Sequence, residues 1–130
     1  MGPEHNRLAV AAALLADIGT PEAVAGLRKL LEERYNPRQR AVAAGLRWSK
    51  NPAACDLMRP LLESPYSELS EDAALLLGRF ADRGAAGPLD RILLRRQSNP
   101  AALVTLAAWY LLKIAGSSAS TVQELVRESR

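Results

Sequence analysis

Residues 15–31 read LADIGTPEAVAGLRKLL and predict the end of one helix, a short turn and the start of a second helix. The turn consists of Gly19-Thr20-Pro21. Threonine is a favoured cap for a helix N-terminus, and proline is best tolerated at the first helical position. Beyond the turn, apolar side chains recur at helical spacing and form one stripe: Val24, Leu27, Leu30 and Leu31. The stretch is therefore predicted to be a helical hairpin.

The hairpin recurs along the chain with a period of 31 residues. The period links Leu15, Leu46 and Leu77 in the first helices, and Leu27, Met58 and Leu89 in the second helices. A looser fourth copy follows at steps of 33 or 34 residues, with Leu111, Val122, Leu125 and Val126 in matching positions. Residues 115–120, AGSSAS, are expected to form a longer turn within that copy.

The repeat predicts an all-α fold, a short right-handed α-solenoid (an α-α superhelix) of four helical hairpins in one domain, residues 1–130. The repeats run roughly over residues 5–35, 36–66, 67–98 and 99–130 and are called repeats 1 to 4 below. Eight helices are expected, at 5–18, 21–34, 37–48, 52–63, 68–81, 85–96, 99–115 and 119–128. One hairpin cannot bury its apolar stripe alone, so the first helices should form one layer and the second helices another. Leu15, Ile18, Leu27 and Leu31 are expected to hold the stacked hairpins together.

The opening stretch resembles a HEAT-like repeat of the phycobilisome-lyase type, whose pattern is L-G-x-I-G-D-x-x-A-V-x-x-L-x-x-L-L. The matching positions are Leu15, Ile18, Gly19, Ala23, Val24, Leu27, Leu30 and Leu31, and Thr20 replaces the usual acidic cap. Residues 36–46, NPRQRAVAAGL, are similar to the first helix of such repeats. The resemblance covers most of the chain, although repeats 3 and 4 lack the Gly-Asp turn. It implies the fold, but such repeats serve scaffolds, lyases and nucleic-acid enzymes alike.

Composition excludes several classes of site. The single cysteine, Cys55, excludes an internal disulfide framework and a cysteine-based metal cluster. One histidine, His5, cannot build the multi-histidine iron site of the related deoxyhypusine hydroxylases or supply Ser-His or Cys-His catalysis. Cys55 aligns with Val24 and Ala86, which are core positions, so we expect it to be a small buried side chain. We therefore expect no catalytic residues, no metal and no cofactor.

No signal peptide is recognisable in the first residues, and the most apolar run, residues 101–115, is too short to span a bilayer and contains Lys113. These features favour a soluble protein in the cytoplasm, with no membrane insertion.

Nucleic acid is a possible partner, because some HEAT-like DNA glycosylases combine aromatic and basic side chains on a concave surface. The chain has 17 Lys and Arg against 14 Asp and Glu, a net charge of only +3. Acidic residues interleave with the basic ones on the same predicted helices, where a groove that tracks phosphates should show less compensation. A bilin lyase-like function remains a lesser alternative.

A strip on the second helices is the strongest candidate binding surface. In this family those helices line the concave face, which implies binding through their outward residues. Exposed leucines flanked by arginines suit a protein interface, since interfaces favour apolar anchors and arginine. The strip is expected to comprise Arg28, Leu57, Arg59, Arg91, Leu94 and Arg95. We expect it to bind an acidic or amphipathic protein segment, which makes the protein a non-enzymatic scaffold or adaptor.

Two further features stand outside the repeat pattern. Pro60 lies about two turns into a predicted helix, where it should remove a backbone hydrogen bond and bend the helix. Trp109 and Tyr110 are adjacent in an almost wholly apolar helix and cannot share one face. That helix is expected to be fully buried, with a second surface for partner binding or self-association at Trp109 and Tyr110 as the alternative.

Overall fold

The structure is a computed structural model, and it describes residues 3–115. Within this range it contains seven α-helices, three short 3-10 helices and no strand. In chain order they are α1 (Pro3–Ile18), α2 (Pro21–Leu31), α3 (Pro37–Leu46), α4 (Ala53–Met58), η1 (Arg59–Glu63), α5 (Ser67–Arg79), η2 (Arg83–Ala85), α6 (Ala86–Leu94), η3 (Arg96–Ser98) and α7 (Ala101–Ala115). The helix predicted at residues 119–128 and most of the turn predicted at 115–120 lie outside the described residues.

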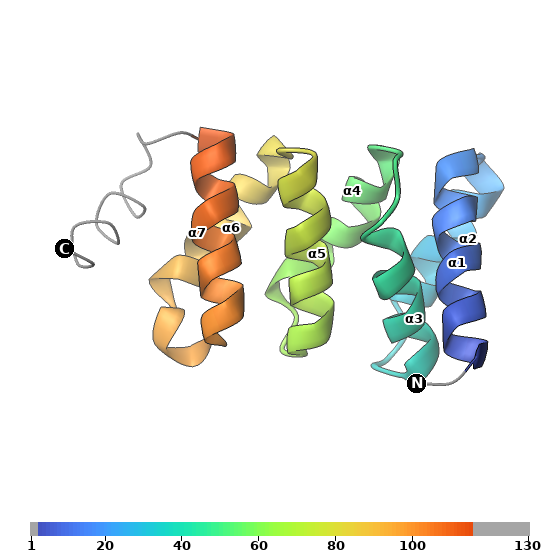
Figure 1. Cartoon of the computed structure of the whole chain (residues 1–130), viewed down its shortest axis with the longest axis horizontal. Coiled ribbons are helices and arrows are strands. Elements are labelled where there is room, and N and C mark those ends of the chain that lie inside the picture. Colours follow the sequence, from blue (N-terminus) through green and yellow to red (C-terminus); the bar gives the residue numbers. More distant parts are fainter. Residues whose placement is uncertain (1–2, 116–130) are drawn as a thin grey trace.

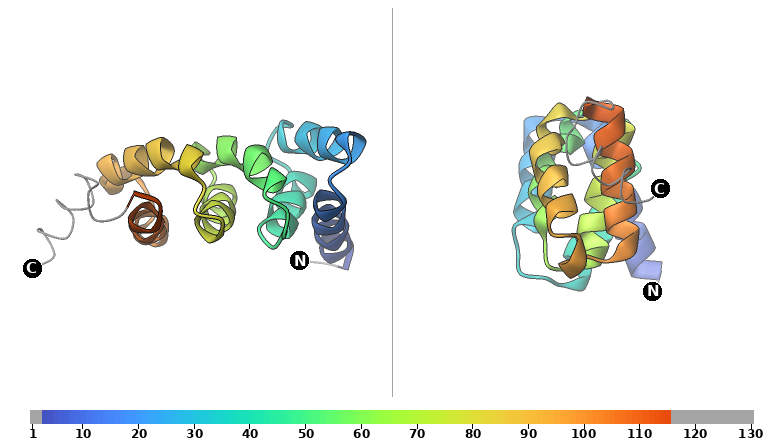
Figure 2. Two further views of the ribbon diagram at one scale, coloured as in Figure 1. Left: turned by 90° about the horizontal axis from the view of Figure 1, so that it is seen from above. Right: turned by 90° about the vertical axis from the view of Figure 1, so that its left-hand side faces the viewer.

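The helices form two layers, as the repeat predicts. The first helices α1, α3, α5 and α7 lie side by side in chain order, each packed on its neighbours (Figure 1). The second helices form the other layer, in which α2 contacts α4 and η1 contacts α6 (Figure 2). The prediction of an all-α solenoid is confirmed. The observed helices are generally shorter than predicted, because 3-10 turns take over at several of their ends.

The core consists of the apolar positions that recur with the period. Leu27, Met58 and Leu89 are all buried, and so are Leu46 and Leu77. The prediction that four residues of repeat 1 hold the hairpins together is partly wrong: Leu27 and Leu31 of α2 are buried, but Leu15 and Ile18 of α1 are exposed. Leu46 and Leu77, the counterparts of Leu15, lie on helices with a neighbour on both sides in the same layer, whereas α1 has a neighbour on one side only (Figure 2).

Polar side chains fix the helix starts. Thr20 caps α2 by accepting the Ala23 amide at 3.2 Å. Asn36 caps α3 by accepting the Gln39 amide at 2.9 Å. Asn51, ahead of α4, accepts a hydrogen bond from the amide of Ala53 at 3.0 Å and donates one to the carbonyl of Ala16 at 2.9 Å. Asn51 therefore ties the turn before α4 to the end of α1 in the preceding repeat.

Pro60 changes the type of helix. α4 ends at Met58, and the chain continues as the 3-10 helix η1 from Arg59 to Glu63. Proline lacks the N–H that would bond the carbonyl four residues back, and its ring crowds that carbonyl. Because η1 begins at Arg59, Pro60 lies in the first turn of a new helix, where an N–H would have no partner within that helix. The predicted disturbance therefore takes the form of a change from α-helix to 3-10 helix.

Repeat 3 keeps the backbone of the repeat 1 turn without its glycine. Gly19 has φ +70°, and Ala81, two periods later, has φ +49°. Both lie in the left-handed region, where a side chain crowds the backbone. After α5 the amides of Ala81 and Asp82 bond the carbonyls of Gly78 and Leu77 at 3.1 and 2.9 Å. These bonds hold Ala81 in the conformation that ends α5.

Two glycines allow close approach between first-layer helices. A Cβ on Gly45 would lie 2.0 Å from the backbone oxygen of Ala9, so α3 packs directly on the backbone of α1. A Cβ on Gly78 would lie 2.0 Å from the ring of Tyr110, so α5 accommodates an aromatic ring of α7. The α1–α3 contact is thus made by backbone against backbone, and the α5–α7 contact is made by an aromatic ring against a glycine.

Candidate functional site

The predicted strip lies on the second layer, but its residues have different environments. Arg28 is on α2, Arg59 begins η1, and Arg91 and Leu94 belong to α6, with Arg95 just after it. Four of the five side chains are exposed, and Arg59 is half-buried. The sixth predicted member, Leu57, does not belong to this surface.

Leu57 is a core residue. Its side chain is 4% exposed and joins the central apolar cluster. Sequence position suggested an outward residue because Leu57 lies off the stripe that faces the first layer. However, α4 contacts α2 in its own layer as well as α3 and α5 in the first layer, so more than one side of this short helix is covered. The prediction that Leu57 lies on an exposed binding strip is wrong.

Arg59 is held between two carboxylates. Its Nε and Nη2 donate to the two oxygens of Asp82, both at 2.8 Å, and its Nη1 donates to Asp56 at 2.9 Å. The guanidinium lies over Gly84, where a Cβ would be 2.6 Å from Nε. The bond to Asp82 raises the pKa of Arg59 above its ordinary value. Arg59 therefore joins repeat 2 to the turn of repeat 3 and is not a free cation.

Glu63 gathers two more arginines of the strip. Arg91 makes a bidentate pair with it at 2.8 and 3.0 Å, and Nη2 of Arg95 donates to it at 2.8 Å. The hydrogen bond from Arg91, together with both positive charges, lowers the pKa of Glu63. Three arginines thus contact acids that the strip prediction did not include, Asp56, Asp82 and Glu63. In the sequence, acidic and basic residues alternate on the same predicted helices, and this pattern is what indicated ion pairs of this kind.

Arg28, the remaining cation of the predicted strip, differs from the other three arginines in its contacts. Within residues 3–115 it forms no ion pair, and the same holds for its neighbour Lys29. Both are exposed in the last turn of α2, where positive charge complements the helix dipole. Their ammonium and guanidinium groups are open to an acidic ligand.

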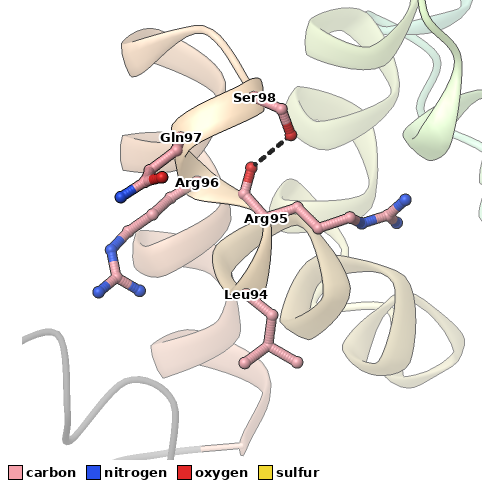
Figure 3. Close-up of a pocket in the computed structure, with 5 residues that line it drawn as sticks. All are labelled: Leu94, Arg95, Arg96, Gln97 and Ser98. Carbon is pink, nitrogen blue, oxygen red and sulfur yellow. Dashed lines mark hydrogen bonds between the residues drawn. The ribbon is translucent and has the colours of Figure 1, made fainter.

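Leu94 is the exposed apolar residue of the predicted strip. It is 62% exposed at the end of α6 and borders an open hollow of about 460 Å³. The other lining residues are Arg95, Arg96, Gln97 and Ser98. Figure 3 shows Leu94 and Arg95 pointing away from Arg96 and Gln97, while Ser98 Oγ donates to the Arg95 carbonyl at 2.9 Å. Sequence reasoning identified Leu94 and Arg95 but missed Arg96, which η3 brings to the same hollow.

Side chains satisfy the exposed carbonyls at the end of α6. Asn99 Nδ2 donates to the Arg95 carbonyl at 2.7 Å and to the Ile92 carbonyl at 3.3 Å. Four carbonyls at a helix end lack helical partners, so these bonds fix the turn that carries Leu94. The hollow is therefore built on a capped helix end.

The two residues of the possible second surface point in different directions. Trp109 is 69% exposed, whereas Tyr110 is half-buried against Gly78. The prediction that the two rings lie on different faces is confirmed. The expectation that the whole helix is buried is wrong at Trp109.

Chemistry at Cys55 is limited by its surroundings. The thiol is buried in the core, as expected, and burial raises its pKa to about 11. Thiolate is the reactive form, so Cys55 is a poor nucleophile. Among residues 3–115 no group of three His, Cys, Asp or Glu side chains is placed to hold a metal ion. None of the helices in this range is long and apolar enough to cross a membrane.

The comparison with protein families agrees with the repeat architecture. A family model described as HEAT repeats matches residues 3–78. The chain belongs to the HEAT repeat family. No curated protein and no solved structure matches it. HEAT repeats commonly act as protein-interaction scaffolds, so membership supports a binding role in general and identifies no partner.

Proposed function

We propose that this HEAT repeat protein is a non-enzymatic scaffold that binds a partner protein through its second-layer surface. The observation that carries the proposal is Leu94, a large apolar side chain that is exposed at the end of α6 next to Arg95. An apolar anchor flanked by arginines matches the composition of protein interfaces. The stacked helices of residues 3–115 support this surface.

The distribution of charge favours an acidic or amphipathic partner segment at the α6 end. Arg59 is outnumbered by its two carboxylate partners, so its cluster has a net charge of −1. Arg91 and Arg95 share one carboxylate, so their cluster has a net charge of +1. Positive charge is therefore concentrated beside Leu94 and, at the other end, at Arg28. An acidic segment anchored at Leu94 meets unlike charge there.

The nucleic-acid alternative has less support from the ion pairs. Arg59, Arg91 and Arg95 each donate to a carboxylate in the strip, and phosphate would have to compete with these acids. The bilin-lyase alternative and the phycobilisome-lyase subtype rest on the sequence pattern of residues 15–31. A binding that weakens steeply with added salt and lacks dependence on Leu94 would favour nucleic acid instead.

The test is an affinity capture from the native cell with three forms of the protein: wild type, Leu94→Glu and Leu14→Glu. Both substitutions place a carboxylate at an exposed leucine, but Leu14 is on α1, away from the strip. The proposal expects a set of proteins that wild type and Leu14→Glu retain and Leu94→Glu loses. If Leu94→Glu captures the same proteins as wild type, the α6 surface is not the binding site.

Arg28→Glu tests the other end of the surface. Arg28 makes no ion pair within the described residues, so reversing its charge leaves the inter-repeat contacts intact. Arg59→Glu is a poor probe, because it places a third acid beside Asp56 and Asp82. A partner that spans the strip should be held more weakly by Arg28→Glu, and one confined to the α6 end should not change.

A further inference from the structure

The contact between α3 and α5, which joins repeat 2 to repeat 3, differs from the other two contacts of the first layer. Between α1 and α3 the backbone of Ala9 meets Gly45, and between α5 and α7 the ring of Tyr110 meets Gly78. α3 and α5 pack on each other less extensively than either of these pairs of helices. The junction between repeats 2 and 3 therefore has the smallest contact in the first layer among the described helices.

Charged side chains stand at this junction where the preceding one has alanine. Arg40 and Arg47 correspond, one period earlier, to Ala9 and Ala16 of α1. Both arginines reach α5: Nε of Arg40 lies 3.9 Å from a carboxylate oxygen of Glu68, and Arg47 forms the pair with Asp72. The row that is built of small apolar residues between repeats 1 and 2 is thus ionic between repeats 2 and 3.

The pair of Arg47 and Asp72 is largely removed from water. Nη1 of Arg47 donates to Oδ1 of Asp72 at 2.9 Å, and Asp72 is 8% exposed. Nε of Arg47 is buried and has no acceptor within the described residues. Burial raises the pKa of Asp72 even though Arg47 lies beside it, which means that the pairing does not fully repay the lost hydration of the carboxylate. Such a pair holds two helices less firmly than apolar side chains of similar volume would.

The second layer crosses the same junction through ion pairs as well. Arg59 of repeat 2 binds Asp82 of repeat 3, and Glu63 of repeat 2 binds Arg91 and Arg95 of repeat 3. The side chains of Glu63, Arg91 and Arg95 are each at least one third exposed. Dissolved salt can therefore reach and screen these pairs, whereas it leaves apolar packing within each repeat in place.

We propose that the junction between repeats 2 and 3 is a hinge of the solenoid and that ionic strength controls how far it bends. The helices of repeats 1 and 2 form one unit, and α5, α6 and α7 form the other. The screening length of salt falls from about 10 Å at 0.1 M to about 3 Å at 1 M, so the ion pairs weaken over this range. Bending here changes the angle between the surface of α2 and that of α6, whether or not Leu94 is a binding site.

Distances between two spin labels on the 130-residue chain test the proposal. The variants Ala25→Cys and Ala102→Cys, combined in one chain, place labels at exposed positions of α2 and α7, on opposite sides of the junction. Cys55 reacts slowly with the label, because it is buried and its pKa is raised to about 11. Double electron–electron resonance gives the distance distribution at low salt and at about 1 M salt. The proposal expects a distribution that broadens and shifts at high salt.

Two further label pairs serve as controls within the units. Ala25→Cys with Lys50→Cys reports on repeats 1 and 2, and Arg83→Cys with Ala102→Cys reports on repeats 3 and 4. All four positions are exposed. Both control distributions should be the same at low and high salt. A spanning pair that does not respond to salt overturns the proposal. Control pairs that broaden as much as the spanning pair would mean that the solenoid bends evenly along its length, which also overturns it.

Two changes at the junction should act in opposite directions. Asp82→Asn removes a carboxylate of the second-layer contact and should broaden the spanning distribution already at low salt. Arg47→Met combined with Asp72→Leu replaces the buried pair by apolar side chains, and should narrow the distribution and reduce its response to salt. Glu32→Gln, which alters an exposed carboxylate away from the junction, should have no effect. Circular dichroism confirms that each variant is folded. A spanning distribution that neither change at the junction alters would overturn the proposal.

Discussion

Ala81 stores backbone strain that the matching glycine of repeat 1 avoids. Ala81 has φ +49°, and its Cβ crowds the backbone in this region, whereas Gly19 at φ +70° has no Cβ. We predict that Ala81→Gly raises the free energy of unfolding by about 0.5–1 kcal/mol, after allowance for the greater freedom of glycine in the unfolded chain. Urea denaturation monitored by circular dichroism measures the change.

Gly19→Ala is the reverse control for this prediction. It introduces the same left-handed strain, and the new Cβ would lie 2.7 Å from Asn51 Nδ2. The loss should therefore exceed about 1 kcal/mol. An Ala81→Gly variant no more stable than wild type would show that the turn of repeat 3 relaxes without cost.

Leu57 and Leu94 are two leucines of the same predicted strip with opposite environments. Leu57 is buried in the core and Leu94 is exposed. Leu57→Ala should lower the free energy of unfolding by about 2–5 kcal/mol, the usual cost of emptying a leucine site in a core. Leu94→Ala should change it by less than about 0.5 kcal/mol. Equal effects of the two substitutions in urea denaturation would contradict the assignment of Leu57 to the core.

At the scale of the helical elements, ion pairs join successive repeats along the second layer. Glu63 at the end of η1 accepts from Arg91 of α6 and from Arg95, and Arg59 reaches Asp82 ahead of η2. On the turn side of the first layer, Arg47 of repeat 2 pairs with Asp72 of repeat 3 at 2.9 Å. Ionic contacts thus accompany the apolar packing from one hairpin to the next.

The Glu63 cluster makes stability depend on pH. Arg91 first, and Arg95 with it, lower the pKa of Glu63 in the folded protein below its unfolded value of 4.5. The cluster therefore contributes stability above that value, and the contribution disappears as pH falls through the folded pKa. Because the pair is partly exposed, Glu63→Gln should cost only about 0.5 kcal/mol at neutral pH.

The difference between Glu63→Gln and wild type should vanish near the lowest pH at which the protein stays folded, since Glu63 is then protonated. Urea titrations over a pH series measure it. Glu32→Gln is the control, because Glu32 is exposed and makes no ion pair within the described residues. A constant difference across the series would mean that Glu63 acts through packing and not through its charge.

At the scale of the whole molecule, the main contacts between helices in residues 3–115 lie within one repeat or between adjacent repeats, so damage should spread over a limited distance. Leu27 is a core residue of repeat 1, and Leu77 is a core residue of repeat 3, with neighbours on both sides. We predict that Leu27→Ala speeds amide hydrogen exchange mainly in α1 and α2. Leu77→Ala should speed it from α3 through α7.

Hydrogen exchange resolved by mass spectrometry checks this prediction. Each substitution should remove about 2–5 kcal/mol of local stability, which is well above the detection limit of the method. Uniform acceleration along the chain in both variants would show that the solenoid unfolds as one cooperative unit.

The sequence was sufficient to predict the architecture, because a period of 31 residues repeats the same burial requirement in each hairpin. It was less informative about the sides of the helices. Leu57 is buried on a helix that contacts helices of both layers, and Ile18 is exposed on α1, which has a neighbour on one side only. The spacing of apolar residues within one helix does not show which of its sides is covered by a neighbouring repeat.

The helices that carry Leu94 and Arg95 could be predicted from the sequence, but the ion pairs made by the arginines of the strip could not. Leu94 and Arg95 lie where the pattern placed them, on and beside α6. However, Arg59 and Arg91 contact acids about 23 and 28 residues away in the chain, and such pairs depend on how the hairpins stack. Only the three-dimensional register of the repeats brings Asp82 and Glu63 to those arginines.

The glycines between first-layer helices have a consequence for the shape of the solenoid. The separation of α1 and α3 is set at Gly45 by a hydrogen atom, and that of α5 and α7 is set at Gly78 by an aromatic ring. Widening one layer while the other stays fixed changes the superhelical bend. A single substitution at Gly45 or Gly78 could therefore change the curvature of the solenoid during evolution. The surface residues would stay the same but would be presented on a differently curved face.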